Sequence, residues 1–311
     1  MNLLFNEDYK MDKIIIHEVG MRDGLQVEQE TVPTEKKIEW INKLFETGVD
    51  IIQVGSFVNP KRMPQMADTD ELFRIIAEQK KKPDNVILSG LVLNEKGLER
   101  GIDCGVEMFC MGVSASETHS QRNTGMSINE ALTRIINMAK SAMSAGKKVQ
   151  VSVQSAFGCG FEGKIPKEKV LDMISKYFEN GIDNISLADT AGHAFPKQVE
   201  EMIRDIKKLN PKVNITAHFH DTYGLGIANC YSAYNEGVTS FESAFAGLGG
   251  CPFTAKASGN VCTEDLVNMF NRMGLRKDID VQKISEIAKE TEEFFKREMP
   301  GKIYRMGVLN Y

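Results

Sequence analysis

Residues 170–188 of the chain, VLDMISKYFENGIDNISLA, carry the pattern that decides the fold. Apolar residues first recur three and four positions apart, from Val170 to Phe178, which predicts a helix with one apolar face against a sheet. Gly181 then stands where a left-handed backbone conformation commonly ends a helix. The apolar run 185–188 follows and predicts a buried strand. The segment is therefore predicted to be one helix–strand unit.

The same unit recurs along the chain. Glycine introduces a Gly-x-Asp or Gly-x-Thr triplet between a predicted helix and a predicted strand at 48–50, 101–103, 181–183 and 237–239. Eight apolar, strand-like runs are present, at residues 14–16, 51–54, 86–93, 108–113, 149–153, 185–188, 213–217 and 241–246. Eight such units in about 250 residues, with continuously apolar strands, predict a closed (β/α)8 TIM barrel. A doubly wound open sheet is the alternative, but no Gly-x-Gly-x-x-Gly follows the first run.

The remainder of the chain predicts additional C-terminal helices from about residue 263. Their apolar stripe is expected to pack on the chain's own barrel or on another subunit, and it comprises Val281, Ile284, Ile287, Ala288, Phe294 and Phe295. No linker-like or low-complexity segment divides the sequence, so residues 1–311 are predicted to form a single domain.

Composition narrows the class of protein. The 311 residues are 42% hydrophobic and 26% charged, which is typical of a globular chain with a sizeable core. A net charge of −5 with dispersed Lys and Arg argues against nucleic acid and membrane surfaces as partners. No signal-peptide pattern or membrane-spanning run is found, so a cytoplasmic location is expected. The six cysteines form no Cys-x-x-Cys pair and are expected to be mostly buried small residues, with Cys251 as the exception considered below.

Unusual polar residues collect where the predicted strands end. His218 and His220 end the seventh run two residues apart, so both side chains face the same side of a strand. Asp23 follows the first run and Asn260 follows the eighth, and closure of a barrel makes these strands neighbours. One carboxylate, two imidazoles and an amide oxygen suit a divalent cation such as Mg²⁺ or Mn²⁺. The sequence therefore predicts a metal site formed by Asp23, His218, His220 and Asn260.

Several longer segments resemble one family. They are Glu18–Gln26 (EVGMRDGLQ), Ser56–Lys61 (SFVNPK), Phe161–Ile165 (FEGKI), His218–Gly224 (HFHDTYG), Ala246–Pro252 (AGLGGCP) and Ala257–Asn260 (ASGN). In order and spacing they resemble the 3-hydroxy-3-methylglutaryl-CoA lyases, a group of metal-dependent TIM-barrel lyases, over about residues 14–270. The resemblance implies the same four metal ligands that the positions of the residues at the strand ends predict: Asp23, His218, His220 and Asn260.

The resemblance also implies an activity. A 3-hydroxyacyl-CoA would be cleaved between C2 and C3 by retro-Claisen chemistry to acetyl-CoA and a keto acid. Arg22 would stabilise the developing enolate oxygen, and Asp23 or His218 would accept the hydroxyl proton. Cys251 is expected to donate a proton to the enolate carbon from a glycine-rich lid formed with Gly247, Gly249 and Gly250. A buried small Cys251 and a phosphate-binding loop are the alternatives for this segment.

Other residues are weaker candidates. Gln53 and Ser56 are expected to face the substrate, and Asp189 is either a polar wall of the site or a loop aspartate. Glu264 either supports the site or simply occupies the first turn of a helix capped by Thr263. Asp221 either orients a histidine or caps a loop. The remaining histidines are expected to be structural: His17, His119 and His193.

The chain also departs from the family pattern. Gln53 stands where the lyases carry a glutamate, Val54-Gly55 replaces a small polar pair, and Met21 replaces a proline beside the arginine. The acyl-CoA substrate is therefore expected to differ, and a lyase for another hydroxyacyl-CoA, such as citramalyl-CoA, is one alternative. A Claisen-condensing synthase and a metal-retaining barrel with a binding or regulatory role are the others. A homo-oligomer, a dimer, is expected.

Overall fold

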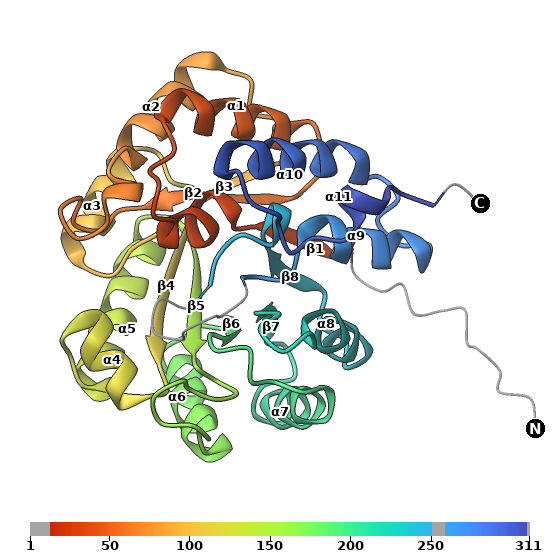
Figure 1. Cartoon of the computed structure of the whole chain (residues 1–311). Helices are drawn as coiled ribbons and strands as arrows, with labels where there is room; N and C mark the ends of the chain where they lie inside the picture. The colour runs from red at the N-terminus through yellow and green to blue at the C-terminus, as the bar shows by residue number, and fades with distance from the viewer. Residues whose placement is uncertain (1–12, 251–258, 310–311) are drawn as a thin grey trace, which may run out of the picture.

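Eight parallel strands form a closed barrel in sequence order, with β8 hydrogen-bonded back to β1 (Figure 1). The computed structural model describes residues 13–250 and 259–309. The strands are β1 (Ile15–Glu18), β2 (Ile51–Ser56), β3 (Ile87–Leu91), β4 (Met108–Ser114), β5 (Lys148–Gln154), β6 (Asn184–Asp189), β7 (Asn214–Phe219) and β8 (Ser240–Ser243). The predicted TIM barrel is confirmed.

Helices surround the barrel (Figure 1). They are α1 (Thr34–Phe45), α2 (Thr69–Gln79), α3 (Glu95–Asp103), α4 (Glu117–Thr124), α5 (Ile128–Ser144), α6 (Lys167–Glu179), α7 (Pro196–Leu209), α8 (Gly226–Asn235), α9 (Thr263–Arg272), α10 (Val281–Phe295) and α11 (Ile303–Met306). No helix in the described part of the chain is both long and apolar enough to cross a membrane.

Residues 170–188, from which the fold is predicted, form helix α6 followed by strand β6, as expected. Val170, Ile174 and Tyr177 of α6 are fully buried, and Gly181 has a φ of +75° directly after the helix. Such a φ favours glycine, which lacks the Cβ atom that would clash there. The triplet at 101–103 differs, because Gly101 lies inside α3 and Gly105, with a φ of +81°, makes the turn instead.

The eighth strand is shorter than predicted. β8 ends at Ser243, whereas the sequence predicts a strand to residue 246. The backbone amide of Phe245 donates to the Glu18 carboxylate instead of a neighbouring strand. Ala246 has a φ of +59° within the short helix η4 (Phe245–Gly247). The chain therefore turns away from the sheet above β8 and crosses the barrel mouth.

The apolar stripe of α10 packs on the chain's own barrel. Ile284, Ile287 and Ala288 are fully buried, and the ring of Phe294 lies 5.9 Å from that of Trp40 in α1. Figure 1 shows α10 alongside α1 at the β1–β2 side of the barrel. Of the two expected positions for this stripe, the structure shows the intramolecular one.

Candidate active site and metal centre

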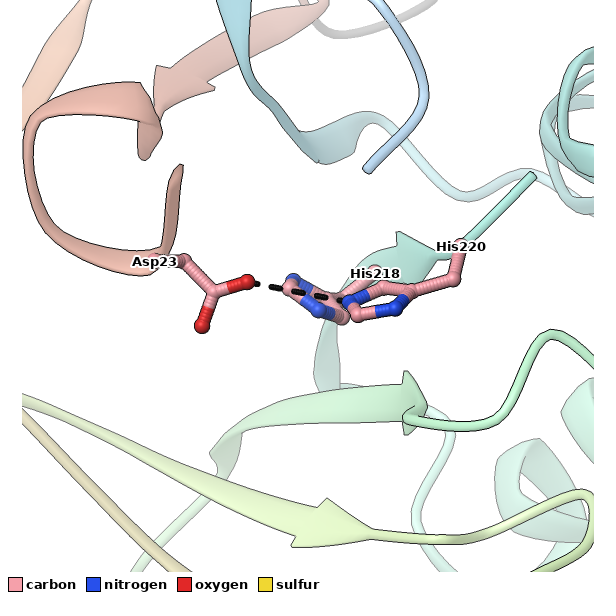
Figure 2. A group of neighbouring side chains, drawn as sticks. All are labelled: Asp23, His218 and His220. Atoms are coloured by element: carbon pink, nitrogen blue, oxygen red, sulfur yellow. Dashed lines mark ion pairs between the residues drawn. The ribbon is translucent and has the colours of Figure 1, made fainter. Parts of the chain in front are cut away.

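The predicted metal ligands meet at the carboxyl ends of the strands. Asp23 lies in η1 (Gly20–Gly24), the single turn after β1, while His218 and His220 lie at the end of β7. Figure 2 shows the Asp23 carboxylate facing the two imidazoles. Potential ligand atoms of these three buried residues all lie within 4.8 Å of one another. The three side chains can therefore reach one ion.

Asn260 joins this group because residues 259–261 pair with the end of β7 and the two residues that follow it. The amide of Val261 donates to the carbonyl of Phe219, and Asn260 forms a bridge with His220. The Asn260 Nδ2 atom donates to Asp23 Oδ2 over 2.9 Å. The structure thus brings all four predicted ligands together.

The donor set fits a divalent metal ion. Asn260 Oδ1 is buried and has no hydrogen-bond partner, an arrangement that costs free energy unless another group binds there, and His220 Nε2 lies 3.7 Å from Asp23 Oδ2. Burial works against ionisation of Asp23, but Arg22, His220 and His218 hold the pKa of its carboxyl well below the usual range. The Asp23 carboxylate is therefore ionised, and together with two imidazoles and an amide oxygen it would offer a metal ion a mixed N/O site.

Arg22 is fixed beside the candidate metal site on two sides. One guanidinium nitrogen donates to Asp23 Oδ1, and Nε donates to Oε1 of Gln53 on β2. Both Gln53 and Ser56 are buried and line the same cavity. A planar cation held in this way presents its charge toward the cavity without having to reorganise.

Glu242 of β8 is a site residue that the sequence analysis missed. Its Oε2 atom lies 2.7 Å from His218 Nδ1, and its Oε1 atom lies 3.3 Å from Nδ1 of His17, which was expected to be structural. Burial works against a charge on Glu242, yet the two histidines hold its pKa far below the usual range. A glutamate within a run that is predicted to be a buried strand needs a polar partner in the barrel. Its position in that run is the sequence feature that could have identified Glu242.

The site opens into a cavity of about 480 Å³ in the barrel mouth. Its neutral polar lining includes Gln53, Ser56, Gln150, Ser152, Gln154, Ser186 and Thr190. Among the residues that the structure describes, its cations are Arg22 and the exposed Arg62. His119, another expected structural residue, also lines it.

Regular alternation along β2 predicts that Gly55 shares a side with Gln53, but Gly55 does not face this cavity. The pairing of β2 with β3 shifts register between the two residues. A Cβ atom on Gly55 would lie 2.5 Å from Oγ1 of Thr69 in α2, on the outside of the barrel. The bulge breaks the alternation of faces.

Asp189 and Asp221 act within their loops. Asp189 accepts hydrogen bonds from the backbone amides of His193 and Ala194, and burial raises the pKa of its carboxyl to about 6. Asp221 accepts from the amide of Gly226, the first residue of α8. Of the alternatives for these two aspartates, the loop roles account for the observed contacts.

Glu264 lies outside the barrel, under the segment that follows β8. Its Oε2 atom accepts from the amide of Ala246, and burial raises the pKa of its carboxyl to about 8. The expected Thr263 cap is wrong, since Cys262 occupies the N-cap position and the Thr263 hydroxyl donates to Glu18. Glu264 therefore contacts the loop backbone.

Glycine is required where the predicted lid crosses the site. Gly249 has a φ of +113°, and a Cβ atom there would lie 2.5 Å from Nδ2 of Asn260. Gly247 has a φ of +66°, and Gly250 lines the cavity. Cys251 lies outside the described residues, so its role and the closing of a lid stay predictions.

Comparison with known proteins agrees with this geometry. The family model HMGL-like matches residues 13–290. The hydroxymethylglutaryl-CoA lyase YngG of Bacillus subtilis is 37% identical over 93% of this chain and 96% of its own length. A cytoplasmic 3-hydroxy-3-methylglutaryl-CoA lyase of Rattus norvegicus is 40% identical over 87% of this chain and 78% of its own. An HMG-CoA lyase structure from Acinetobacter baumannii, in complex with coenzyme A and 3-methylmalate, superposes with a TM-score of 0.90 at 36% identity, covering 97% of this chain and 98% of that one.

The fold and site thus define a TIM-barrel protein of the carbon–carbon lyase class, with residues able to hold a divalent metal ion. More narrowly, the chain belongs to the HMGL-like family, whose relatives named above are hydroxymethylglutaryl-CoA lyases.

Proposed function

We propose that the protein is a divalent-metal-dependent lyase that cleaves a 3-hydroxyacyl-CoA to acetyl-CoA and a keto acid. The observation that carries this proposal is the buried cluster of Asp23, His218, His220 and Asn260 beside Arg22 at the barrel mouth. The coenzyme A complex of the Acinetobacter lyase, at 36% identity, supports an acyl-CoA substrate. Mg²⁺ or Mn²⁺ is the proposed ion, since hard cations take carboxylate and amide oxygens.

The reaction needs a base at the 3-hydroxyl group and positive charge at the thioester oxygen. Asp23, or His218 if its Nε2 atom is not bound to the ion, accepts the hydroxyl proton, C3–O becomes a carbonyl, and the C2–C3 electron pair moves into the thioester enolate. Arg22 faces the enolate oxygen as a fixed cation. When bound, the metal ion supplies Lewis acidity that lowers the pKa of the hydroxyl. A proton then returns to C2 to give acetyl-CoA, with Cys251 as the predicted donor.

The acyl group is proposed to differ from 3-hydroxy-3-methylglutaryl. Gln53 accepts from Arg22 where the resembling lyases carry a glutamate, so the Arg22 charge is less neutralised in this chain. Many side chains of the cavity wall are neutral, Gln150, Ser152 and Ser186 among them. Gln53 is therefore proposed to adapt the site to another hydroxyacyl-CoA. A synthase or a non-catalytic barrel has no observation here in its favour.

A substrate panel tests this proposal. The purified protein with Mg²⁺ or Mn²⁺ is incubated with 3-hydroxy-3-methylglutaryl-CoA, citramalyl-CoA and related 3-hydroxyacyl-CoAs, and acetyl-CoA is measured by chromatography. Cleavage of one member that stops on chelation is the expected result. No acetyl-CoA from any member would leave the binding or regulatory barrel as the better explanation. The cytoplasmic location and the dimeric state are proposals that this panel does not address.

A further inference from the structure

The interior of the barrel below the metal ligands holds a chain of polar side chains that starts at Ser89 and ends at His218. Ser89 Oγ lies 2.8 Å from His17 Nε2, and His17 Nδ1 lies 3.3 Å from Glu242 Oε1. Glu242 Oε2 lies 2.7 Å from His218 Nδ1. His17 and Ser89 are fully buried, and Glu242 and His218 are buried as well. Four strands therefore contribute one continuous path of polar contacts, in which the Ser89–His17 and Glu242–His218 steps are hydrogen bonds and the His17–Glu242 step is a 3.3 Å ion-pair contact.

The chemistry of the carboxylate fixes the protons along this path. An ionised carboxylate can only accept hydrogen bonds, so each ring nitrogen that faces it must donate. His218 then carries its proton on Nδ1, which leaves the Nε2 lone pair free for a metal ion. His17 extends the contacts of this carboxylate, since its Nδ1 atom lies 3.3 Å from Glu242 Oε1 and its Nε2 atom is hydrogen-bonded to Ser89 Oγ.

We propose that Glu242 is a positioning residue for metal binding: it holds His218 in the tautomer and ring orientation that a metal ion requires, and His17 in turn holds Glu242. This inference rests on the proposed metal site. Ser186 Oγ donates to the same Oε2 atom from 3.4 Å and limits rotation of the carboxylate further. A histidine ligand supported by a carboxylate is more basic and better oriented than an isolated one.

Titration with Mn²⁺, followed by calorimetry and by the Mn²⁺ electron paramagnetic resonance signal, tests the proposal without a substrate. Glu242→Gln is expected to weaken Mn²⁺ binding by ~10- to 100-fold, since the amide cannot accept from both imidazoles through two oxygens. Glu242→Asp is expected to restore part of the loss. His17→Gln leaves the Glu242–His218 contact in place, so a smaller loss in the same direction is expected.

Ser240→Ala is the matched control. Ser240 lies two residues before Glu242 on β8. Its hydroxyl oxygen accepts a hydrogen bond from Thr216 Oγ1, and Thr216 lies two residues before His218 on β7. This variant removes a buried hydroxyl from the same strand and is expected to bind Mn²⁺ like the unmodified protein.

The outcomes separate this inference from the proposed function. Unmodified protein that binds Mn²⁺ while Glu242→Gln binds it within twofold overturns the inference alone. Failure of the unmodified protein to bind Mn²⁺ overturns the inference and the proposed function together. Should Glu242→Gln not fold, His17→Gln decides, and binding equal to that of the Ser240→Ala control would refute the role of this path.

Discussion

Two buried acidic clusters lie close to the first strand, and they differ in charge. In the barrel mouth, Asp23 and Glu242 face Arg22, His17 and His218, and the pKa values of both carboxyls are held far below the usual range. Outside the barrel, Glu18 and Glu264 contact backbone amides and the Thr263 hydroxyl. Burial raises the pKa of Glu18 to about 7 and that of Glu264 to about 8.

The difference shows that burial alone does not mark a functional carboxylate. Burial opposes ionisation in both clusters, and the neighbouring cations decide which cluster stays ionised. Ionised carboxylates can ligate a metal ion, whereas protonated ones act as hydrogen-bonding parts of the scaffold. The inner cluster, formed by Asp23 and Glu242 with their basic neighbours, is therefore the candidate for chemistry. The outer cluster, formed by Glu18 and Glu264, supports the loop that follows β8.

The largest expected effect comes from removing a ligand of the inner cluster. His220→Ala should lower metal affinity by ~100-fold or more and abolish acetyl-CoA release, because a lost ligand weakens the site more than a lost supporting group. Elemental analysis after dialysis measures the metal content. His193→Ala, which removes a histidine from the β6–α7 loop, serves as the control. Full metal occupancy in His220→Ala would place the ion elsewhere.

Arg22→Lys tests the fixed cation of the inner cluster. An ammonium group cannot contact Asp23 and Gln53 through the same planar fork, so kcat should fall ~100-fold or more with little change in KM. Steady-state kinetics on the substrate identified by the panel measure both constants. A change confined to KM would show that Arg22 only binds substrate.

Gln53→Glu should produce a smaller effect that depends on the substrate. An added negative charge beside Arg22 should raise kcat/KM for 3-hydroxy-3-methylglutaryl-CoA and lower it for the native substrate. The idea fails if the unmodified protein already cleaves 3-hydroxy-3-methylglutaryl-CoA at ~10⁴ M⁻¹s⁻¹ or above and Gln53→Glu leaves that value unchanged.

The smallest effect on the active site is expected from Glu264→Gln in the outer cluster. This substitution is expected to change the pH dependence of the free energy of unfolding. The folded chain keeps the Glu264 proton up to a pKa of about 8, whereas the unfolded chain releases it near 4.5. Stability of the unmodified protein therefore falls between these pH values, and the Glu264→Gln substitution removes that contribution. Relative to Glu264→Gln, the unmodified protein should lose a few kcal/mol between pH 5 and pH 9, at ~1.4 kcal/mol per pKa unit. Urea unfolding at both pH values measures this, and parallel curves would show that Glu264 is ionised throughout.

The sequence predicts the barrel and the four ligands because both depend on local pattern and order. Each strand carries its own apolar run, and Asp23, His218 and Asn260 follow the first, seventh and eighth of these runs along the chain. Barrel closure then brings strand ends together. The resemblance to the lyases adds the role of Arg22.

The path from His17 through Glu242 to His218 could not be predicted in the same way. Its contacts join β1, β7 and β8 across the barrel interior, and no spacing in the sequence encodes which inward side chains meet. The outward turn of Gly55 depends on a register shift between Gln53 and Gly55, which the alternation of a regular strand does not reveal. The early end of β8 depends on a hydrogen bond from Phe245 to the distant Glu18.

The most direct test of the contrast between the two clusters is anomalous diffraction from a crystal grown or soaked with Mn²⁺. The charge arrangement predicts one strong peak within coordination distance of Asp23, His218, His220 and Asn260, and none beside Glu18 or Glu264. A peak at the outer cluster, or no peak in the barrel mouth at saturating Mn²⁺, would contradict this account.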